Sequence, residues 1–151
     1  MLGKTYTFSQ AELNGRGDLA KGADKLDVRA IELAFEKHLQ QSSGGKLNLN
    51  SALPMTKGLS LLTGQKALYR DNYKFTDRDI KAFNNATGTI VSHYGKTKLK
   101  IGNTVLYGNH GYSVVGSDAS RVYVVNPWDT SKTIALSHSQ FKDFFTDFAQ
   151  V

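Results

Sequence analysis

Residues 104–128 read TVLYGNHGYSVVGSDASRVYVVNPW, and their alternation of apolar and polar side chains predicts β-structure. Three strands are expected here, at Thr104–Tyr107, Gly111–Val115 and Val122–Val125. Turn-forming residues at Gly116–Ser120 join the last two strands as a hairpin. Connections this short leave no room for the crossover helices that parallel strands require, so the stretch predicts an antiparallel sheet.

The same period of two extends the sheet on both sides of this stretch. Thr89–Ser92 precedes it and Thr133–Leu136 follows it, and Thr5–Phe8 also alternates like a strand. The lysines at 96, 98 and 100 fall in a loop or an edge strand, where they solvate one face and block edge pairing. We therefore expect an α+β fold with a curved or barrel-like antiparallel sheet.

Helices are expected to flank this sheet. Apolar residues recur at helical spacing over about Asp27–Leu39, Thr76–Asn84 and Ser139–Phe148, and a shorter helix is expected near Leu59–Leu62. Each of the three longer segments also carries a start signal. These signals are an N-cap at Asp27 and the capping patterns Thr76-x-x-Asp79 and Ser137-x-x-Gln140.

The last predicted helix carries a stripe of phenylalanines. The stripe consists of Phe141, Phe144, Phe145 and Phe148. Aromatic side chains repeated at this spacing are typical of core packing, not of a cofactor site.

Length and composition bound the function classes. The chain has 151 residues, so we expect a single domain over residues 1–151. Its net charge of +6 is compatible with a polyanionic partner, but the lysines are scattered and form no basic patch, so nucleic-acid binding is not expected. No apolar run is long enough to span a membrane, and the first residues lack the apolar core of a signal peptide.

The absence of cysteine restricts the chemistry. It removes disulfides and thiolate metal sites and is compatible with every redox compartment, so it leaves the localisation open. No histidine and carboxylate group has zinc spacing, and no glycine loop has phosphate-binding form. We therefore expect no metal and no cofactor.

One pair of residues is a candidate for chemistry. His110 opens one predicted strand and Asn126 closes the next, so antiparallel pairing brings the two side chains together if both point to the same face. In nucleophilic catalysis an imidazole takes the proton of a thiol or hydroxyl, and a third group fixes the imidazole's tautomer and orientation. An asparagine amide oxygen can fill that third role, and Trp128 would shelter the bond from water.

The same residues also fit plain turn chemistry, with a histidine at a strand end and an asparagine before Pro127. The other histidines, His38, His93 and His138, have no such partner nearby in the sequence and are expected to be surface or packing residues.

Several segments resemble one family of proteins. Residues 109–114, NHGYSV, resemble the Gly-His-Ala-Tyr-Ser-Val box of calpain-type cysteine proteases, which are papain-like. Residues 126–128, NPW, resemble the family's Asn-Pro-Trp-Gly box, although Asp129 stands where the family has glycine. Residues 28–37, VRAIELAFEK, are similar to the family's Trp-x-x-Leu-x-Glu-Lys-Ala-Tyr-Ala-Lys helix.

Weaker similarities follow in the same order along the chain. They are Gly44-Gly45, Leu62-Thr63-Gly64 and the helix expected around Phe141–Phe148.

The resemblance implies roles for three residues. His110 is the implied general base, Asn126 its orienting partner, and Trp128 the indole that covers their hydrogen bond. The family's nucleophile lies in a Gln-Gly-x-x-Gly-Asp-Cys-Trp box on a preceding half, and Asn14–Leu19 is too close to the next helix to stand for it. The chain thus resembles the His/Asn-bearing half of the protease core.

Two functions fit these observations. In the first, the chain supplies the general base and its orienting partner to a cysteine on another segment or chain. The two parts together hydrolyse peptide bonds in a peptide or protein substrate. In the second, it is a pseudoprotease or a module that binds a peptide or partner protein without catalysis. A serine hydrolase ranks third, because no Gly-x-Ser-x-Gly elbow occurs. On either of the first two, this chain alone is expected to be inactive.

Overall fold

The computed structural model describes residues 4–16, 26–48, 54–86, 88–95 and 97–151. The chain divides into two compact units, Met1–Leu53 and Pro54–Val151. The residues expected at the site all belong to the second unit. The expectation of a single domain over the whole chain stays a prediction.

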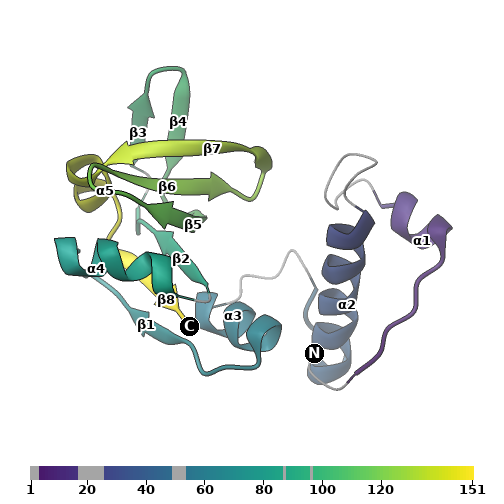
Figure 1. Cartoon of the computed structure of the whole chain (residues 1–151). Helices are drawn as coiled ribbons and strands as arrows, with labels where there is room; N and C mark the ends of the chain where they lie inside the picture. The colour runs from purple at the N-terminus through teal and green to yellow at the C-terminus, as the bar shows by residue number, and fades with distance from the viewer. Residues whose placement is uncertain (1–3, 17–25, 49–53, 87, 96) are drawn as a thin grey trace. The chain divides into compact units, whose positions relative to one another are not determined.

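The described part of the first unit contains a short helix α1 (Gln10–Asn14) and a long helix α2 (Leu26–Ser43) (Figure 1). The helix expected from Asp27 is confirmed and is longer than expected, but it begins at Leu26, so Asp27 lies in its first turn and is not its N-cap. The strand expected at Thr5–Phe8 was wrong, because these residues have no strand conformation. A segment this short needs a ladder partner, and the hydroxyl of Tyr6 instead lies 3.3 Å from Nδ1 of His38 on α2.

A six-stranded antiparallel sheet forms the centre of the second unit, in the order β1-β8-β2-β5-β6-β7. Its strands are β1 (Leu68–Arg70), β2 (Thr89–Ser92), β5 (Gly111–Ser117), β6 (Arg121–Asn126), β7 (Asp129–Ser137) and β8 (Asp147–Gln150). The four strands expected in β2, β5, β6 and β7 are confirmed, and the α+β class with them.

The sheet is neither closed nor curled, so the expectation of a curved or barrel-like sheet was wrong. A barrel requires its first and last strands to pair with a fixed stagger. Here β1 and β7 lie at opposite edges, and within the described residues each pairs with a single neighbour. The alternating sequence predicted the strands but carried no information on whether the edges meet.

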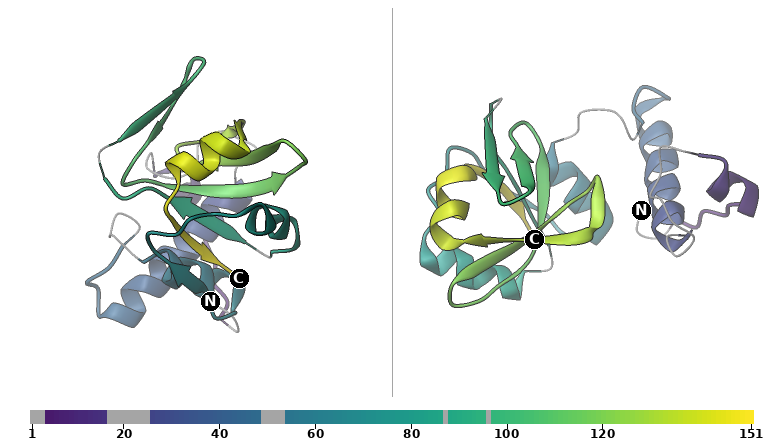
Figure 2. Two further views of the ribbon diagram at one scale, coloured as in Figure 1. Left: turned by 90° about the vertical axis from the view of Figure 1, so that its left-hand side faces the viewer. Right: turned by 90° about the horizontal axis from the view of Figure 1, so that it is seen from above.

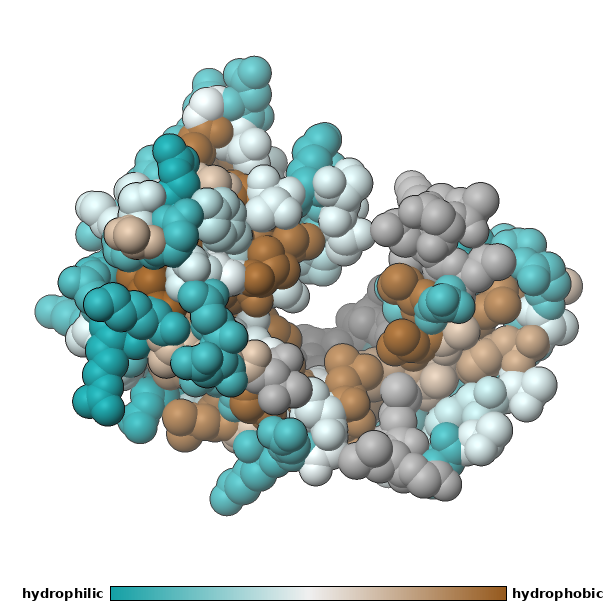
Figure 3. Space-filling model, viewed as in Figure 1, coloured by the Kyte–Doolittle hydropathy of each residue, from teal (hydrophilic) through white to brown (hydrophobic). Residues whose placement is uncertain are grey.

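A separate hairpin consists of β3 (Lys98–Ile101) and β4 (Thr104–Tyr107). It projects beyond the six-stranded sheet (Figures 1 and 2). Lys98 and Lys100 are exposed on it, as expected for lysines on an edge strand, while Leu99 and Ile101 pack against the core. Hydrophilic residues accordingly cover the tip of this hairpin (Figure 3).

Three α-helices accompany the sheet within the described residues. They are α3 (Met55–Thr63), α4 (Asp77–Ala82), which a 3-10 turn extends over Phe83–Asn85, and α5 (His138–Phe144). The expected capping boxes are present at α4 and α5. At α4 the Thr76 hydroxyl accepts from the backbone N–H of Asp79, and at α5 the Ser137 hydroxyl accepts from the backbone N–H of Gln140.

The last predicted helix was too long. It ends at Phe144, Phe145 has an extended backbone (φ −87°, ψ 133°), and Phe148 lies in β8. Strand β8 pairs with β1 on one side and with β2 on the other, so its backbone groups find partners in the sheet. Tertiary pairing therefore overrides the helical spacing of the phenylalanines.

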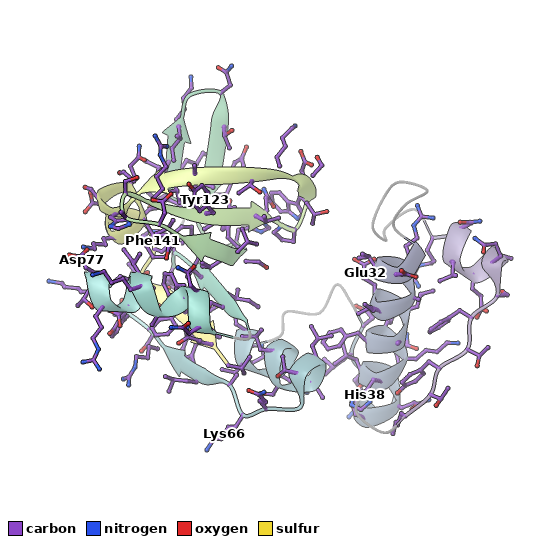
Figure 4. All side chains as sticks on the ribbon, in the orientation of Figure 1. Glu32, His38, Lys66, Asp77, Tyr123 and Phe141 are labelled. Carbon is purple, nitrogen blue, oxygen red and sulfur yellow. The ribbon has the colours of Figure 1, made fainter. Side chains whose placement is uncertain are left out.

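The same phenylalanines form the core, as expected. Phe141, Phe144, Phe145 and Phe148 are all buried. Phe141 lies between α4 and the strands (Figure 4), where its ring makes edge contacts with Phe75 at 5.0 Å and with Phe83 at 5.5 Å. This cluster holds α4 and α5 against the sheet whose other strands carry the candidate site. No helix in the described residues is long and apolar enough to cross a membrane.

Candidate active site

The sheet places the two predicted site residues at neighbouring strand ends. His110 immediately precedes β5, and Asn126 is the last residue of β6. Strands β5 and β6 are antiparallel with Ser113 opposite Val125, so the start of one lies beside the end of the other. This is the arrangement that the strand spacing predicted.

The side chains of this pair meet. Nε2 of His110 lies 2.9 Å from Oδ1 of Asn126. The same Oδ1 accepts a hydrogen bond from the backbone N–H of Trp128 at 2.9 Å, which orients the amide with its oxygen toward both groups. An amide oxygen only accepts, so Nε2 of His110 must carry the proton. In the neutral imidazole the lone pair is then on Nδ1, and no hydrogen bond to that atom is found among the described residues.

Aromatic rings pack around the imidazole. The Trp128 indole lies 3.9 Å from it between ring centroids at an interplanar angle of 34°. The buried ring of Tyr112 meets it edge-on at 4.9 Å. Trp128 itself remains 72% exposed, so it shields the imidazole on one side and is open to solvent on its own other side. The expected approach of Trp128 to the pair is confirmed.

Two hollows lie at the pair. One, of about 210 Å³, is lined by His110 and Asn109 together with Tyr69, His93 and Tyr94. The other, of about 430 Å³, lies between the β3–β4 turn and β7 and has Asn126 in its wall. The pair therefore borders space on two sides.

Two phenols near the pair have raised pKa values. Burial raises the pKa of Tyr69, with the carboxylates of Asp147 and Asp71 adding to it, and burial also raises the pKa of Tyr112. Both phenols are therefore protonated at neutral pH and are not bases there. Within the described residues no group of three or more side chains is arranged to hold a metal ion.

Two residues at the site were missed by sequence reasoning. His93 was expected to be a surface or packing residue; its ring does stack on Phe144, at 5.3 Å, but it also lines the hollow beside His110. Asn109 has a left-handed backbone with φ 52°, and its side-chain oxygen accepts from the backbone N–H of Gly95, in the turn after β2. A signal for Asn109 was present, because asparagine adopts the left-handed backbone conformation more readily than most residues.

The two remaining histidines belong to helices. His38 is on α2 in the first unit, and His138 opens α5, where its Nε2 lies 3.1 Å from the backbone oxygen of Asp118.

This arrangement can orient a base but lacks a nucleophile of the cysteine type. The chain contains no cysteine. Comparison with protein-family models, curated proteins and solved structures finds no match to this chain. The resemblance described from the sequence therefore depends only on the residues that carry it.

Proposed function

We propose that this chain is the His/Asn-bearing half of a calpain-like cysteine endopeptidase, and that it hydrolyses peptide bonds only in combination with a cysteine-bearing half. The observation that carries the proposal is the hydrogen bond between His110 and Asn126. This bond places the proton on Nε2. The lone pair of Nδ1 is then available to accept the proton of a thiol. In a general base, the bond from the other ring nitrogen to an orienting group fixes the tautomer in this way.

The reaction follows from that geometry. Nδ1 of His110 takes the thiol proton, and the thiolate attacks the carbonyl carbon of the scissile peptide bond. The imidazolium then returns the proton to the leaving amine, and an acyl-thioester remains on the cysteine. In the second half of the cycle His110 takes a proton from water, whose oxygen attacks the thioester, and the thiol leaves with the proton restored. Asn126 accepts from Nε2–H throughout and keeps the ring oriented.

The experiment joins the chain to a thiol. The chain is mixed with the cysteine-bearing half of a calpain-type protease, supplied as a separate polypeptide, and hydrolysis of a fluorogenic peptide is followed. A peptidyl epoxide that alkylates the thiolate gives a second readout. We expect neither half to cleave alone, the mixture to cleave, and His110→Ala to abolish both cleavage and alkylation. His138→Ala is the matched control, because that histidine opens α5 away from the pair.

Two results would contradict the proposal. The first is cleavage by this chain alone that survives both His110→Ala and Asn126→Ala. The second is a mixture in which the two halves bind each other but the thiol reacts no faster than in the cysteine-bearing half alone.

A second function, a pseudoprotease or peptide-binding module without catalysis, is favoured by one specific observation. The hollow beside His110 is bordered by exposed aromatic side chains, with Tyr94 85% and Tyr69 49% exposed, in a chain that has no cysteine. Aromatic side chains give large contact area at low conformational cost and are enriched where proteins bind peptides. Peptide binding that is unchanged by His110→Ala, with no cleavage in the mixture, would select this function over the first.

A further inference from the structure

We propose that Asn109 is a positioning residue that fixes the imidazole of His110 against Asn126. Its side-chain amide bonds the turn after β2, and its backbone conformation sets the direction in which the chain reaches His110. The contribution of Asn109 to catalysis rests on the function proposed above, whereas its effect on the His110 geometry does not.

The backbone of Asn109 is the first part of this argument. Its φ of 52° lies in the left-handed region, which non-glycine residues rarely adopt. Asparagine and glycine enter that region most readily, whereas alanine is strained in it. Because Asn109 directly precedes His110, this conformation sets the direction in which the chain enters β5.

Hydrogen bonds then tie the Asn109 segment to His93, Gly95 and Thr97. The Oδ1 atom of Asn109 accepts from the backbone N–H of Gly95 at 2.8 Å. The backbone N–H of Asn109 donates to the oxygen of His93 at 2.7 Å, and that of Gly108 donates to the oxygen of Thr97 at 2.7 Å. Two segments about fourteen residues apart in sequence are thereby held together at three points.

The two segments approach backbone to backbone. A Cβ added at Gly108 would lie 2.0 Å from the oxygen of Gly95, so no side chain fits between them there. Gly95 itself has φ +124°, which also favours glycine. The amide oxygen of Asn109 completes this contact by accepting from the Gly95 N–H. Asn109 is exposed, so water replaces that oxygen as the acceptor when the amide is removed.

The consequence for His110 is geometric. Its imidazole is one residue from this anchored contact and bonds Asn126 on the neighbouring strand end. His93, whose backbone oxygen receives the Asn109 N–H, lines the same hollow as His110. If residue 109 loses its anchoring bond, the start of β5 becomes more mobile. The direction from which Nε2 of His110 approaches Oδ1 of Asn126 then varies more. Asn109 itself takes and gives no proton in the reaction.

The test compares three substitutions that separate the two contributions. Asn109→Asp keeps an acceptor and tolerates the left-handed backbone, Asn109→Gly keeps the backbone and loses the acceptor, and Asn109→Ala loses both. Asn84→Ala is the matched control: Asn84 makes two hydrogen bonds of 2.8 and 2.9 Å to the backbone of Ser117, at the opposite end of β5.

The primary readout is the exchange of the His110 Nε2 proton with water, measured by NMR on the full chain with ¹⁵N-labelled histidine. Thermal unfolding of each variant confirms that it is folded at the temperature used. We expect exchange about five-fold faster in Asn109→Gly, the effect of losing one typical hydrogen bond, and faster still in Asn109→Ala. Asn109→Asp should stay within about two-fold of the original chain, and Asn84→Ala should leave the exchange unchanged.

The second readout is kcat and KM of the combined protease. A positioning role predicts that Asn109→Gly lowers kcat with KM unchanged and that Asn109→Asp restores kcat. Unchanged proton exchange in Asn109→Gly and Asn109→Ala, or equal acceleration by Asn84→Ala, would overturn the inference even if the combined protease is active. Faster exchange in a mixture that never cleaves would instead refute the proposed function and leave the positioning role intact.

Discussion

Replacement of Asn126 by alanine tests the central hydrogen bond of the candidate site. The substitution removes two bonds of 2.9 Å, one from Nε2 of His110 and one from the backbone N–H of Trp128. Each is worth about 0.5–1.5 kcal/mol net. Trp128 is 72% exposed and its N–H regains water, so we expect the free energy of unfolding to fall by about 1–2 kcal/mol in total.

The same estimate applies to the rate of the combined protease. An imidazole that loses an orienting bond of about 1–2 kcal/mol reacts about 5- to 30-fold more slowly if the bond is needed in the transition state. His110→Ala removes the base itself and should reduce cleavage to background. Stability is measured by urea unfolding of the chain alone, and kcat/KM with the fluorogenic peptide after the cysteine-bearing half has been added.

A matched control separates the pair from its surroundings. Asn103 lines the 430 Å³ hollow with Asn126, is exposed, and makes no side-chain hydrogen bond among the described residues, so Asn103→Ala should change neither quantity. The reasoning is refuted if Asn126→Ala retains the stability and kcat/KM of the original chain. It is also refuted if Asn126→Ala is as inactive as His110→Ala while still folded.

Three further predictions concern the scaffold. The Tyr123 hydroxyl, which donates to the Asp118 carboxylate, is the largest cause holding the pKa of Asp118 well below its usual range. A carboxylate with a depressed folded pKa stabilises the fold above its unfolded pKa of about 3.9, and it loses that contribution as the pH falls through the folded value. In acid unfolding, the free energy of unfolding of Tyr123→Phe should therefore fall less steeply below about pH 4 than that of the original chain. Phe141→Ala empties a fully buried site and should cost about 3–5 kcal/mol in urea unfolding, and a cost below about 1 kcal/mol would contradict the core assignment. Gly108→Ala places a Cβ 2.0 Å from the oxygen of Gly95 and should lower the unfolding free energy by at least about 1–3 kcal/mol, visible as a lower Tm.

The strands of the second unit were largely predictable because their signal is local. A half-buried strand alternates apolar and polar residues, and β5 and β6 do so on either side of a short turn. The capping boxes at Thr76 and Ser137 were predictable for a similar reason, since side chain and backbone partners are three residues apart. The meeting of His110 and Asn126 followed from the strand ends they occupy, because antiparallel pairing brings those ends together.

Elements that depend on distant partners were not predictable in this way. Strand β1 has three exposed residues and forms by pairing with β8, which is about eighty residues away in the sequence. The phenylalanines suggested one continuous helix, but pairing with β1 and β2 makes residues 147–150 a strand. The position of His93 beside His110 depends on the folding of the turn after β2 onto the turn before β5.

The sequence by itself determined the α+β class, most strand positions, the aromatic core and the two residues of the candidate pair, because each is encoded in periodicity or in spacing over a few residues. Only the tertiary structure decided that the sheet stays open, that β8 is a strand, and that Asn109 anchors the approach to His110. These features arise from hydrogen bonds and close backbone contacts between segments far apart in the chain. Their free energy depends on the three-dimensional arrangement of both partners, which no local pattern of residues contains.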